Sequence, residues 1–305
     1  MSWRTKASRD WLASLPGVRE QVPLAALTSL GVGGPAEFLV QADSVERLIQ
    51  ILDGAHQRGV PVVVLGAGTN LLVSDRGVEG LTLRCEARGH HIEGHQVRAE
   101  AGLKMMRLAR ICARAGLGGL EWAVGLPGTV GGAVYQNAGC WGFETKDRLL
   151  SVLAWQPGAG ARIWAAGELE LGYRTSGLSQ GRLPGAVVLE ATFALIPSLP
   201  EASLARISEL TRRRRASQPL AQRSCGSVFK NPPGDSAGRL VEEAGMKGAT
   251  EGAAEVSPHH ANFIVNQGGA SAADIDRLIR RVALAVRERS GARLECEVQR
   301  VGRWD

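Results

Sequence analysis

Two glycine-rich stretches have the residue types needed to hold an anionic or flat ligand against the main chain. Residues 66–75 read Gly-Ala-Gly-Thr-Asn-Leu-Leu-Val-Ser-Asp, and their N–H groups and polar side chains could donate to phosphate oxygens. Residues 125–139 contain five glycines and two alanines. Such density is typical of turns with positive φ or of close approach by a ligand. From these residues alone, a surface on which a cofactor lies and a run of tight turns are about equally favoured.

The first stretch does not match either of the common nucleotide-binding fingerprints. After Gly66 and Gly68 it lacks the third glycine and the helical pattern of a Rossmann motif, and it lacks the Gly-Lys-Ser/Thr of a P-loop. A dinucleotide bound here would therefore require another fold.

Composition limits the class of protein. The chain has 305 residues, 44% of them hydrophobic, which is enough for two domains with real cores. No apolar run approaches the roughly 20 residues of a membrane span. The basic N-terminus has no apolar segment behind it, so we expect no export signal and a cytoplasmic protein. A net charge of +6 fits an anionic ligand or nucleic acid.

The five cysteines are scattered and show no Cys-x-x-Cys spacing, which argues against a disulfide framework and against a zinc site. His259 and His260 have no carboxylate or cysteine at metal-ligand spacing nearby. We therefore predict reduced thiols and no metal site.

Hydrophobic periodicity predicts the elements that must position these stretches. Asp43 and Glu46 have capping-box spacing before an amphipathic helix, and residues 60–65 form a buried strand after it. We predict a helix over residues 103–115 and a hairpin from residues 149–155 and 162–165. A glycine turn entering a short strand within residues 28–40 precedes the helix that Asp43 opens, and strand, helix, strand order indicates an α/β layer.

A second set of elements follows Ile196-Pro-Ser-Leu-Pro200, where two prolines mark the best boundary. The predicted domains are therefore residues 1–196 and 197–305. The second contains helices over 202–215 and 236–244 and a long helix opened by a Ser271/Asp274 capping box. Residues 293–301 alternate as a final strand.

Nine short motifs occur in an order that resembles the UDP-N-acetylenolpyruvoylglucosamine reductase family, over about residues 28–301. They are Gly33-Gly-Pro35, residues 66–73, residues 125–133, Asn137-Ala-Gly139, Tyr173-Arg-x-Ser176, residues 226–232 (Gly-Ser-Val-Phe-Lys-Asn-Pro), residues 244–248, residues 260–266 (His-Ala-Asn-Phe-Ile-Val-Asn) and residues 294–298 (Leu-Glu-Cys-Glu-Val). Each motif is weak alone, but their order is specific. The short link between Ser176 and Val187 resembles the shorter, second type of the family. Gln136 stands where the family commonly has methionine.

The resemblance implies an α+β fold: an FAD-binding domain of the vanillyl-alcohol-oxidase (PCMH) type followed by a smaller α/β substrate-binding domain. It implies noncovalent FAD, with NADPH as co-substrate. The implied reaction reduces UDP-N-acetylglucosamine enolpyruvate to UDP-N-acetylmuramate, a step of peptidoglycan precursor synthesis, with hydride reaching C3 and a proton reaching C2. No nucleic acid or membrane partner is expected.

The same resemblance implies roles for single residues. Arg174 would hold the substrate carboxylate, Ser227 would protonate C2, and Glu297 would orient or polarise that centre. Glu295 lies on the same face of the predicted strand, so alternation does not choose between the two glutamates, and the family pattern favours Glu297.

Ligand-binding residues follow from the matched motifs. Those expected to bind FAD are Gly66, Ala67, Gly68, Thr69, Asn70, Gly125, Pro127, Gly128, Gly131, Gly132, Ala133, Asn137 and Gly139. Those expected to bind the sugar nucleotide are Tyr173, Arg214, Lys230 and Asn231.

Two other functions stay open at this point. An alcohol or sugar oxidase of the same broad fold often tethers FAD through His or Cys, and Cys140 stands at the end of the second glycine-rich stretch. A basic nucleic-acid-binding protein could use Arg212–Arg215, although aromatic residues are not interleaved with that run.

Overall fold

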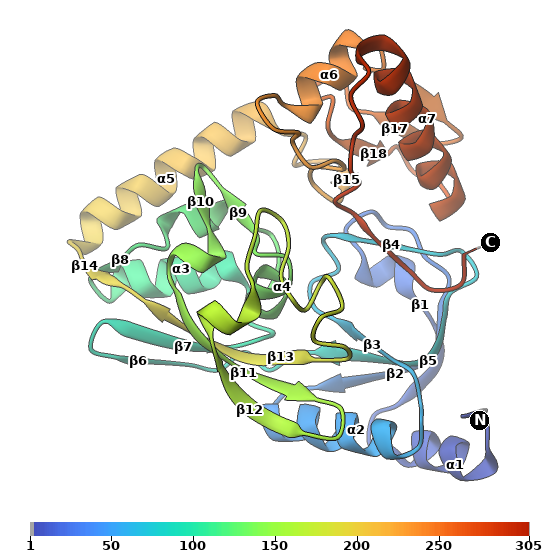
Figure 1. Cartoon of the computed structure of the whole chain (residues 1–305), viewed down its shortest axis with the longest axis vertical. Coiled ribbons are helices and arrows are strands. Elements are labelled where there is room, and N and C mark those ends of the chain that lie inside the picture. The colour runs from blue at the N-terminus through green and yellow to red at the C-terminus, as the bar shows by residue number, and fades with distance from the viewer. Residues whose placement is uncertain (1–2, 305) are drawn as a thin grey trace. The chain divides into compact units, whose positions relative to one another are not determined.

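The computed structural model describes residues 3–304, and the chain divides into two compact units, each made of separated stretches of sequence (Figure 1). The first unit comprises Met1–Arg19, Phe38–Ala67 and Gly80–Arg213. The second comprises Glu20–Glu37, Gly68–Glu79 and Arg214–Asp305. The functional division at residues 196 and 197 stays a prediction.

The first unit contains a five-stranded antiparallel sheet. Its order is β12 (Gly160–Ala165), β11 (Leu149–Gln156), β13 (Val187–Ala194), β7 (Gln96–Glu100) and β6 (His90–Glu93). β11 and β12 form the predicted hairpin, with Leu153 opposite Ile163. The apolar positions of β13 alternate with partly exposed ones, so one face of the sheet enters the core.

A second sheet has the order β1 (Arg19–Pro23), β2 (Pro35–Ala42), β5 (Val78–Cys85) and β3 (Val62–Leu65). β3 runs parallel to β5, as expected for strands joined by a crossover. Three of the five boundaries between the two units fall within β1, β2 and β5.

Helix α2 (Val45–Gln57) follows β2 and packs against β12 and β13 (Figure 1). Its N-cap is Ser44, whose hydroxyl accepts from the Arg47 N–H at 3.2 Å, so the capping box predicted from Asp43 is wrong. The apolar stripe begins at Val45, and the cap must directly precede the first helical turn.

The other helices of the first unit are α1 (Lys6–Ser14), α3 (Met105–Arg114), α4 (Val130–Tyr135) and most of α5 (Pro200–Ser217). Short 3-10 turns lie at Glu121–Gly125 (η2), Thr145–Asp147 (η3) and Ala166–Leu169 (η4). Two-residue strands are β8 (Leu117–Gly118), β9 (Gly139–Cys140), β10 (Phe143–Glu144) and β14 (Ile196–Pro197). α5 is longer than predicted because Pro200 fits the first turn of a helix, where no N–H is needed.

The second unit contains a four-stranded antiparallel sheet and two helices that pack on each other. The sheet order is β15 (Arg223–Ser224), β18 (Ile264–Asn266), β17 (Ala254–Val256) and β16 (Thr250–Glu251). The helices are α6 (Ala237–Glu243) and α7 (Ala272–Ser290). The predicted capping box of α7 is confirmed, with Ser271 and Asp274 bonding reciprocally. A 3-10 turn, η1 (Leu24–Leu27), also belongs to this unit.

The final strand is shorter than predicted. Only β19 (Gln299–Val301) is regular, and it pairs in parallel with β4 (Leu71–Val73). Within residues 294–298 the predicted alternation of burial is only partly kept, since Glu295 is exposed and Val298 is buried but Cys296 and Glu297 are both half-buried. The segment meets a different neighbour, through a single bridge between Cys296 and Phe229. The change of partner divides what the sequence pattern presents as one strand.

Each unit has its own apolar core, and antiparallel sheets with packed helices confirm the α+β class. Within residues 3–304, every helix falls short of the length or the apolarity that a membrane span requires.

Candidate functional site

The second glycine-rich stretch contains a helix that was not predicted. Thr129 caps α4, and its hydroxyl accepts from the Gly132 N–H at 3.4 Å. The Val130 N–H donates to the Leu103 carbonyl and the Gly131 N–H donates to the Ala101 carbonyl. The first amides of this helix therefore bond within the protein.

Several glycines of this stretch are required by close packing of the protein on itself. A Cβ on Gly125 would lie 2.6 Å from Cys140 Sγ, and one on Gly139 would lie 2.2 Å from the Phe143 carbonyl oxygen. A Cβ on Gly131 would lie 2.9 Å from that of Ala101. Tight packing explains these glycines, and their contact with FAD stays a prediction. Gly132 differs, because a Cβ added there would have Thr129 Oγ1 as its nearest neighbour at 3.6 Å, which is an ordinary contact distance.

The loop after β3 lies beside the start of α4. A Cβ on Gly66 would lie 2.7 Å from Thr129 Oγ1, and both residues belong to the first unit. In the described part of the chain, no protein atom accepts from the N–H groups of Ala67, Gly68 and Thr69. Main-chain donors of this kind suit an anion such as a diphosphate.

Among the buried polar atoms of the first unit that lack a hydrogen-bond partner within residues 3–304, two lie in or directly beside the second glycine-rich stretch. They are Gln136 Oε1, on a side chain that is 7% exposed, and Trp141 Nε1, which would lie 2.9 Å from a Cβ on Gly125. Buried polar groups normally make hydrogen bonds, so these atoms suit a ligand that supplies the partners. The residues present therefore fit a flavin. Neither residue is among those that the motifs predict to bind FAD, although Gln136 directly precedes Asn137 and Trp141 follows it by four positions.

The turn that carries Tyr173 and Arg174 is tied to residues 135–139. The Ser176 hydroxyl donates to the Tyr135 carbonyl at 2.6 Å. The Arg174 guanidinium donates through Nη2 to the Gly139 carbonyl, also at 2.6 Å. The structure thus brings the predicted carboxylate-binding arginine to the end of the predicted cofactor stretch.

Asn137 completes this attachment. Its side chain is fully buried, donates to the Gly172 carbonyl at 2.8 Å and accepts from the Lys146 N–H at 2.9 Å. Its φ of 42° lies in the left-handed region, which asparagine tolerates better than most residues. In this structure Asn137 positions the arginine turn.

Arg174 itself has a φ of 54°, an uncommon conformation for a residue that is not glycine. Its guanidinium carbon lies 5.2 Å from the centroid of the Tyr173 ring, which is 47% exposed. Strained backbone of this kind is often retained at functional sites.

In the second unit, residues 228–230 bring the predicted serine and glutamate segments together. The Glu297 N–H donates to the Val228 carbonyl at 2.8 Å, and the Lys230 N–H donates to the Glu295 carbonyl at 2.8 Å. Ser227 is half-buried and directly precedes this pairing. The two predicted catalytic residues of this unit therefore lie on adjacent segments.

The two glutamates have different partners. Glu295 is 71% exposed and its Oε1 lies 2.5 Å from Nζ of Lys230, whose side chain is only 13% exposed. Glu297 lies beside Asn70, because the Asn70 amide donates to the Glu297 carbonyl at 3.1 Å. The structure thus gives Glu295 a side-chain partner, Lys230, and gives Glu297 a main-chain partner, Asn70.

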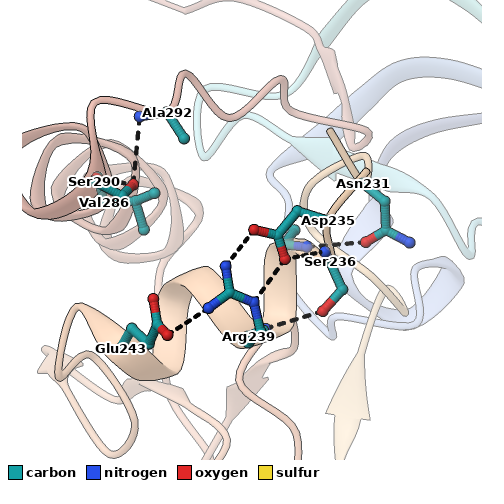
Figure 2. Close-up of polar contacts among 9 residues, drawn as sticks. Asn231, Asp235, Ser236, Arg239, Glu243, Val286, Ser290 and Ala292 are labelled. Atoms are coloured by element: carbon teal, nitrogen blue, oxygen red, sulfur yellow. Dashed lines mark hydrogen bonds and ion pairs between the residues drawn. The ribbon is translucent and has the colours of Figure 1, made fainter. Parts of the chain in front are cut away.

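The remaining predicted substrate residues make local contacts. Figure 2 shows the Asn231 amide oxygen accepting from the N–H at the start of α6, at 3.0 Å, beside the ion pairs of Arg239 with Asp235 and Glu243. Arg214, in the last turn of α5, donates through Nε at 2.9 Å to Oε1 of Gln218, the residue that directly follows this helix.

The neighbouring thiols are not candidates for acid–base chemistry. Burial raises the pKa of Cys225 to about 12 and also raises the pKa of Cys296. Both therefore stay protonated near neutral pH. Within residues 3–304, no group of His, Cys, Asp and Glu has the arrangement of a metal site.

Known proteins match this chain along most of its length. Residues 36–165 match an FAD-binding domain, and residues 218–301 match the C-terminal domain of UDP-N-acetylenolpyruvoylglucosamine reductase. Reductases of that name from Rubrobacter xylanophilus and Caulobacter vibrioides are 45% and 39% identical to it, over 94% and 96% of this chain and 96% and 99% of theirs. The crystal structure of the reductase from Thermus caldophilus superposes with a TM-score of 0.80 at 39% identity, covering 93% of this chain and 99% of that one.

Proposed function

Because the chain belongs to the UDP-N-acetylenolpyruvoylglucosamine reductase family, we propose that it reduces UDP-N-acetylglucosamine enolpyruvate to UDP-N-acetylmuramate with NADPH. This is a step of peptidoglycan precursor synthesis. The observation that carries the proposal is identity of 45% spread over 94% of this chain and 96% of its relative. Similarity on that scale includes both the FAD-binding part and the C-terminal part.

The reaction adds two hydrogens across the enolpyruvyl double bond. C3 gains a hydride equivalent, C2 gains a proton, and NADPH is oxidised to NADP⁺. The chemistry that bound FAD supplies is the carriage of the hydride from NADPH to C3, because side chains have no group that can do so. The loop at residues 66–70 and the stretch at 125–139 would hold it, through the open main-chain donors and the unpartnered buried atoms described above.

Arg174 is the residue that we assign to the substrate carboxylate. Its planar guanidinium offers two parallel donors, and its charge stabilises the negative charge that develops when hydride reaches C3. Attachment of its turn to residues 135–139 supports this role, because a preorganised cation costs little reorganisation during the reaction.

Ser227 is the residue that we assign to protonation of C2, with Glu297 orienting or polarising the same centre. A serine hydroxyl is a weak acid, but the carbanion formed at C2 is a much stronger base, so no histidine relay is needed. Tyr173, Lys230, Asn231 and Arg214 complete the proposed substrate contacts. Domains at residues 1–196 and 197–305 would bind FAD and sugar nucleotide respectively.

Anaerobic half-reactions test the function directly. NADPH should bleach the flavin absorbance of the purified holoenzyme, and UDP-N-acetylglucosamine enolpyruvate should restore it with formation of the lactyl ether. Flavin that NADPH reduces but the enolpyruvyl compound does not reoxidise would contradict the proposal. Acid precipitation should release all of the FAD, because none of the proposed contacts is covalent.

The proposal extends to the setting of the enzyme. We assign it to the cytoplasm, where NADPH is regenerated, without a nucleic-acid or membrane partner. Fractionation that recovered the activity with the membrane pellet would contradict this assignment.

A further inference from the structure

Asn262 is a buried polar residue of the second unit that no motif-based role explains. Its side chain is 3% exposed, and it lies in the turn between β17 and β18. The side-chain amide of Asn262 both accepts from and donates to the main chain of Phe229. The Phe229 N–H donates to Oδ1 at 2.9 Å, and Nδ2 donates to the Phe229 carbonyl at 2.9 Å. Its main-chain carbonyl accepts from the Val228 N–H at 2.8 Å.

The two side-chain hydrogen bonds to Phe229 take the place of a neighbouring strand. Residues 228–230 have main-chain partners on one edge from Glu295 and Glu297, and on the other edge the Asn262 amide supplies Phe229 with the acceptor and the donor that a strand would supply. A primary amide has the same donor and acceptor groups as a peptide, which is why asparagine can do this. Aspartate cannot, since an ionised carboxylate only accepts.

Ser227 lies between two attachments that come from one segment. After it, Val228 and Phe229 are held by Asn262; before it, β15 pairs with β18, which Asn262 closely precedes. Gly226, between them, has a φ of 81° and nothing within 4 Å of where its Cβ would lie. Because this glycine permits rotation, the direction of the Ser227 side chain depends on the attachment that follows it.

We propose that Asn262 is a positioning residue for Ser227, its side-chain amide fixing the main chain that carries the proton-donating hydroxyl. The inference rests on the proposed function, in which Ser227 protonates C2. Asn262 touches neither substrate nor cofactor in this role and acts only through residues 228 and 229. A misplacement of about 1 Å in a reacting group can slow a reaction on the order of 100-fold.

The test is Asn262→Asp, which keeps the size of the side chain and removes its donor. In anaerobic stopped flow on the holoenzyme, NADPH should reduce the flavin within about twofold of the wild-type rate, while reoxidation by the enolpyruvyl substrate should slow roughly 10- to 100-fold. Asn262→Ser, which is uncharged, replaces it if the aspartate variant does not fold. Asn266→Asp is the matched control, because the Asn266 side chain is also buried but bonds Leu30, Gly268 and Ala270, and its substitution leaves the main-chain pairing of β18 with β15 in place.

A double-mutant cycle with Ser227→Ala separates positioning from general damage. If Asn262 acts through the serine, Asn262→Asp should add less than about a twofold change in the Ser227→Ala background. The inference is overturned if both half-reactions slow equally, if reoxidation is unchanged, or if Asn266→Asp slows it as much. Failure of the wild-type enzyme to use the substrate would instead overturn the proposed function.

Discussion

The Asn70 side-chain amide donates to the Glu297 carbonyl at 3.1 Å, and the Gln299 N–H donates back to the Asn70 carbonyl at 3.0 Å. Asn70 lies in the loop predicted to bind FAD. Through both its side chain and its main chain it is therefore bonded to the segment that is predicted to carry a catalytic carboxylate. Glu295, two positions earlier, faces Lys230 instead. The two glutamates therefore have different neighbours, and the role predicted for Glu297 can be tested against Glu295.

Glu297→Gln should lower kcat by about 100-fold, because the carboxylate that orients the protonated carbon is lost. Glu295→Gln is the matched control, and it should leave kcat within about twofold, since the Glu295 side chain is 71% exposed and a solvent-screened carboxylate contributes little to an ion pair. Steady-state kinetics of both variants check this. A larger kcat loss in Glu295→Gln than in Glu297→Gln would reverse the assignment.

Arg174→Lys should lower kcat/KM by roughly 100-fold although the charge is kept, because lysine lacks the planar pair of donors. Arg162→Lys is a suitable control, since Arg162 is an exposed arginine of the same unit that stacks on Trp164. Near-normal turnover of Arg174→Lys would remove Arg174 from carboxylate binding.

Ser227→Ala should leave reduction of the flavin by NADPH within about twofold of wild type and slow reoxidation by the enolpyruvyl substrate by about 100-fold or more. The proton is needed only after hydride transfer to C3, so only the second half-reaction loses its donor. Stopped-flow absorbance of the flavin measures both rates. Equal loss in the two half-reactions would show that the serine is not the proton donor.

Acidification should destabilise the protein through His260. Burial lowers the pKa of His260 below its ordinary value of 6.5, and nearby His259 and Lys247 act in the same direction. Its Nδ1 accepts from the Asn262 N–H at 3.2 Å, which requires the neutral ring. As the pH falls below 6.5 the unfolded chain binds the proton first, so stability present at higher pH is lost down to the folded-state pKa.

Urea unfolding at several pH values between about 7.5 and 5 measures this loss. His260→Asn provides the control, because its amide keeps an acceptor near the position of Nδ1 and does not titrate. The free energy of unfolding should depend less steeply on pH in His260→Asn than in the wild type. Equal slopes would show that His260 does not titrate in this range.

Most of the elements that local patterns predicted are present, because such patterns depend on residues three or four positions apart, but the strands β5, β6 and β7 were not predicted. The Ser271/Asp274 capping box and the hairpin of residues 149–165 formed as expected. Errors occurred where one local sequence pattern was compatible with two different structures. Ser44, and not Asp43, is the N-cap of α2. Thr129 caps a helix within the glycine-rich stretch, where the sequence indicated only turns or a surface for a ligand.

The motifs in their order were sufficient to indicate the family, and with it FAD, NADPH and the reaction, because those properties follow from which residues are present. Tertiary structure alone decided what each side chain contacts: that Asn137 holds the arginine turn, that Lys230 pairs with Glu295, and that Asn70 meets Glu297 across 227 positions of sequence. The physical reason is that such contacts form only when distant segments pack together. Neither segment carries the other's position in its own sequence.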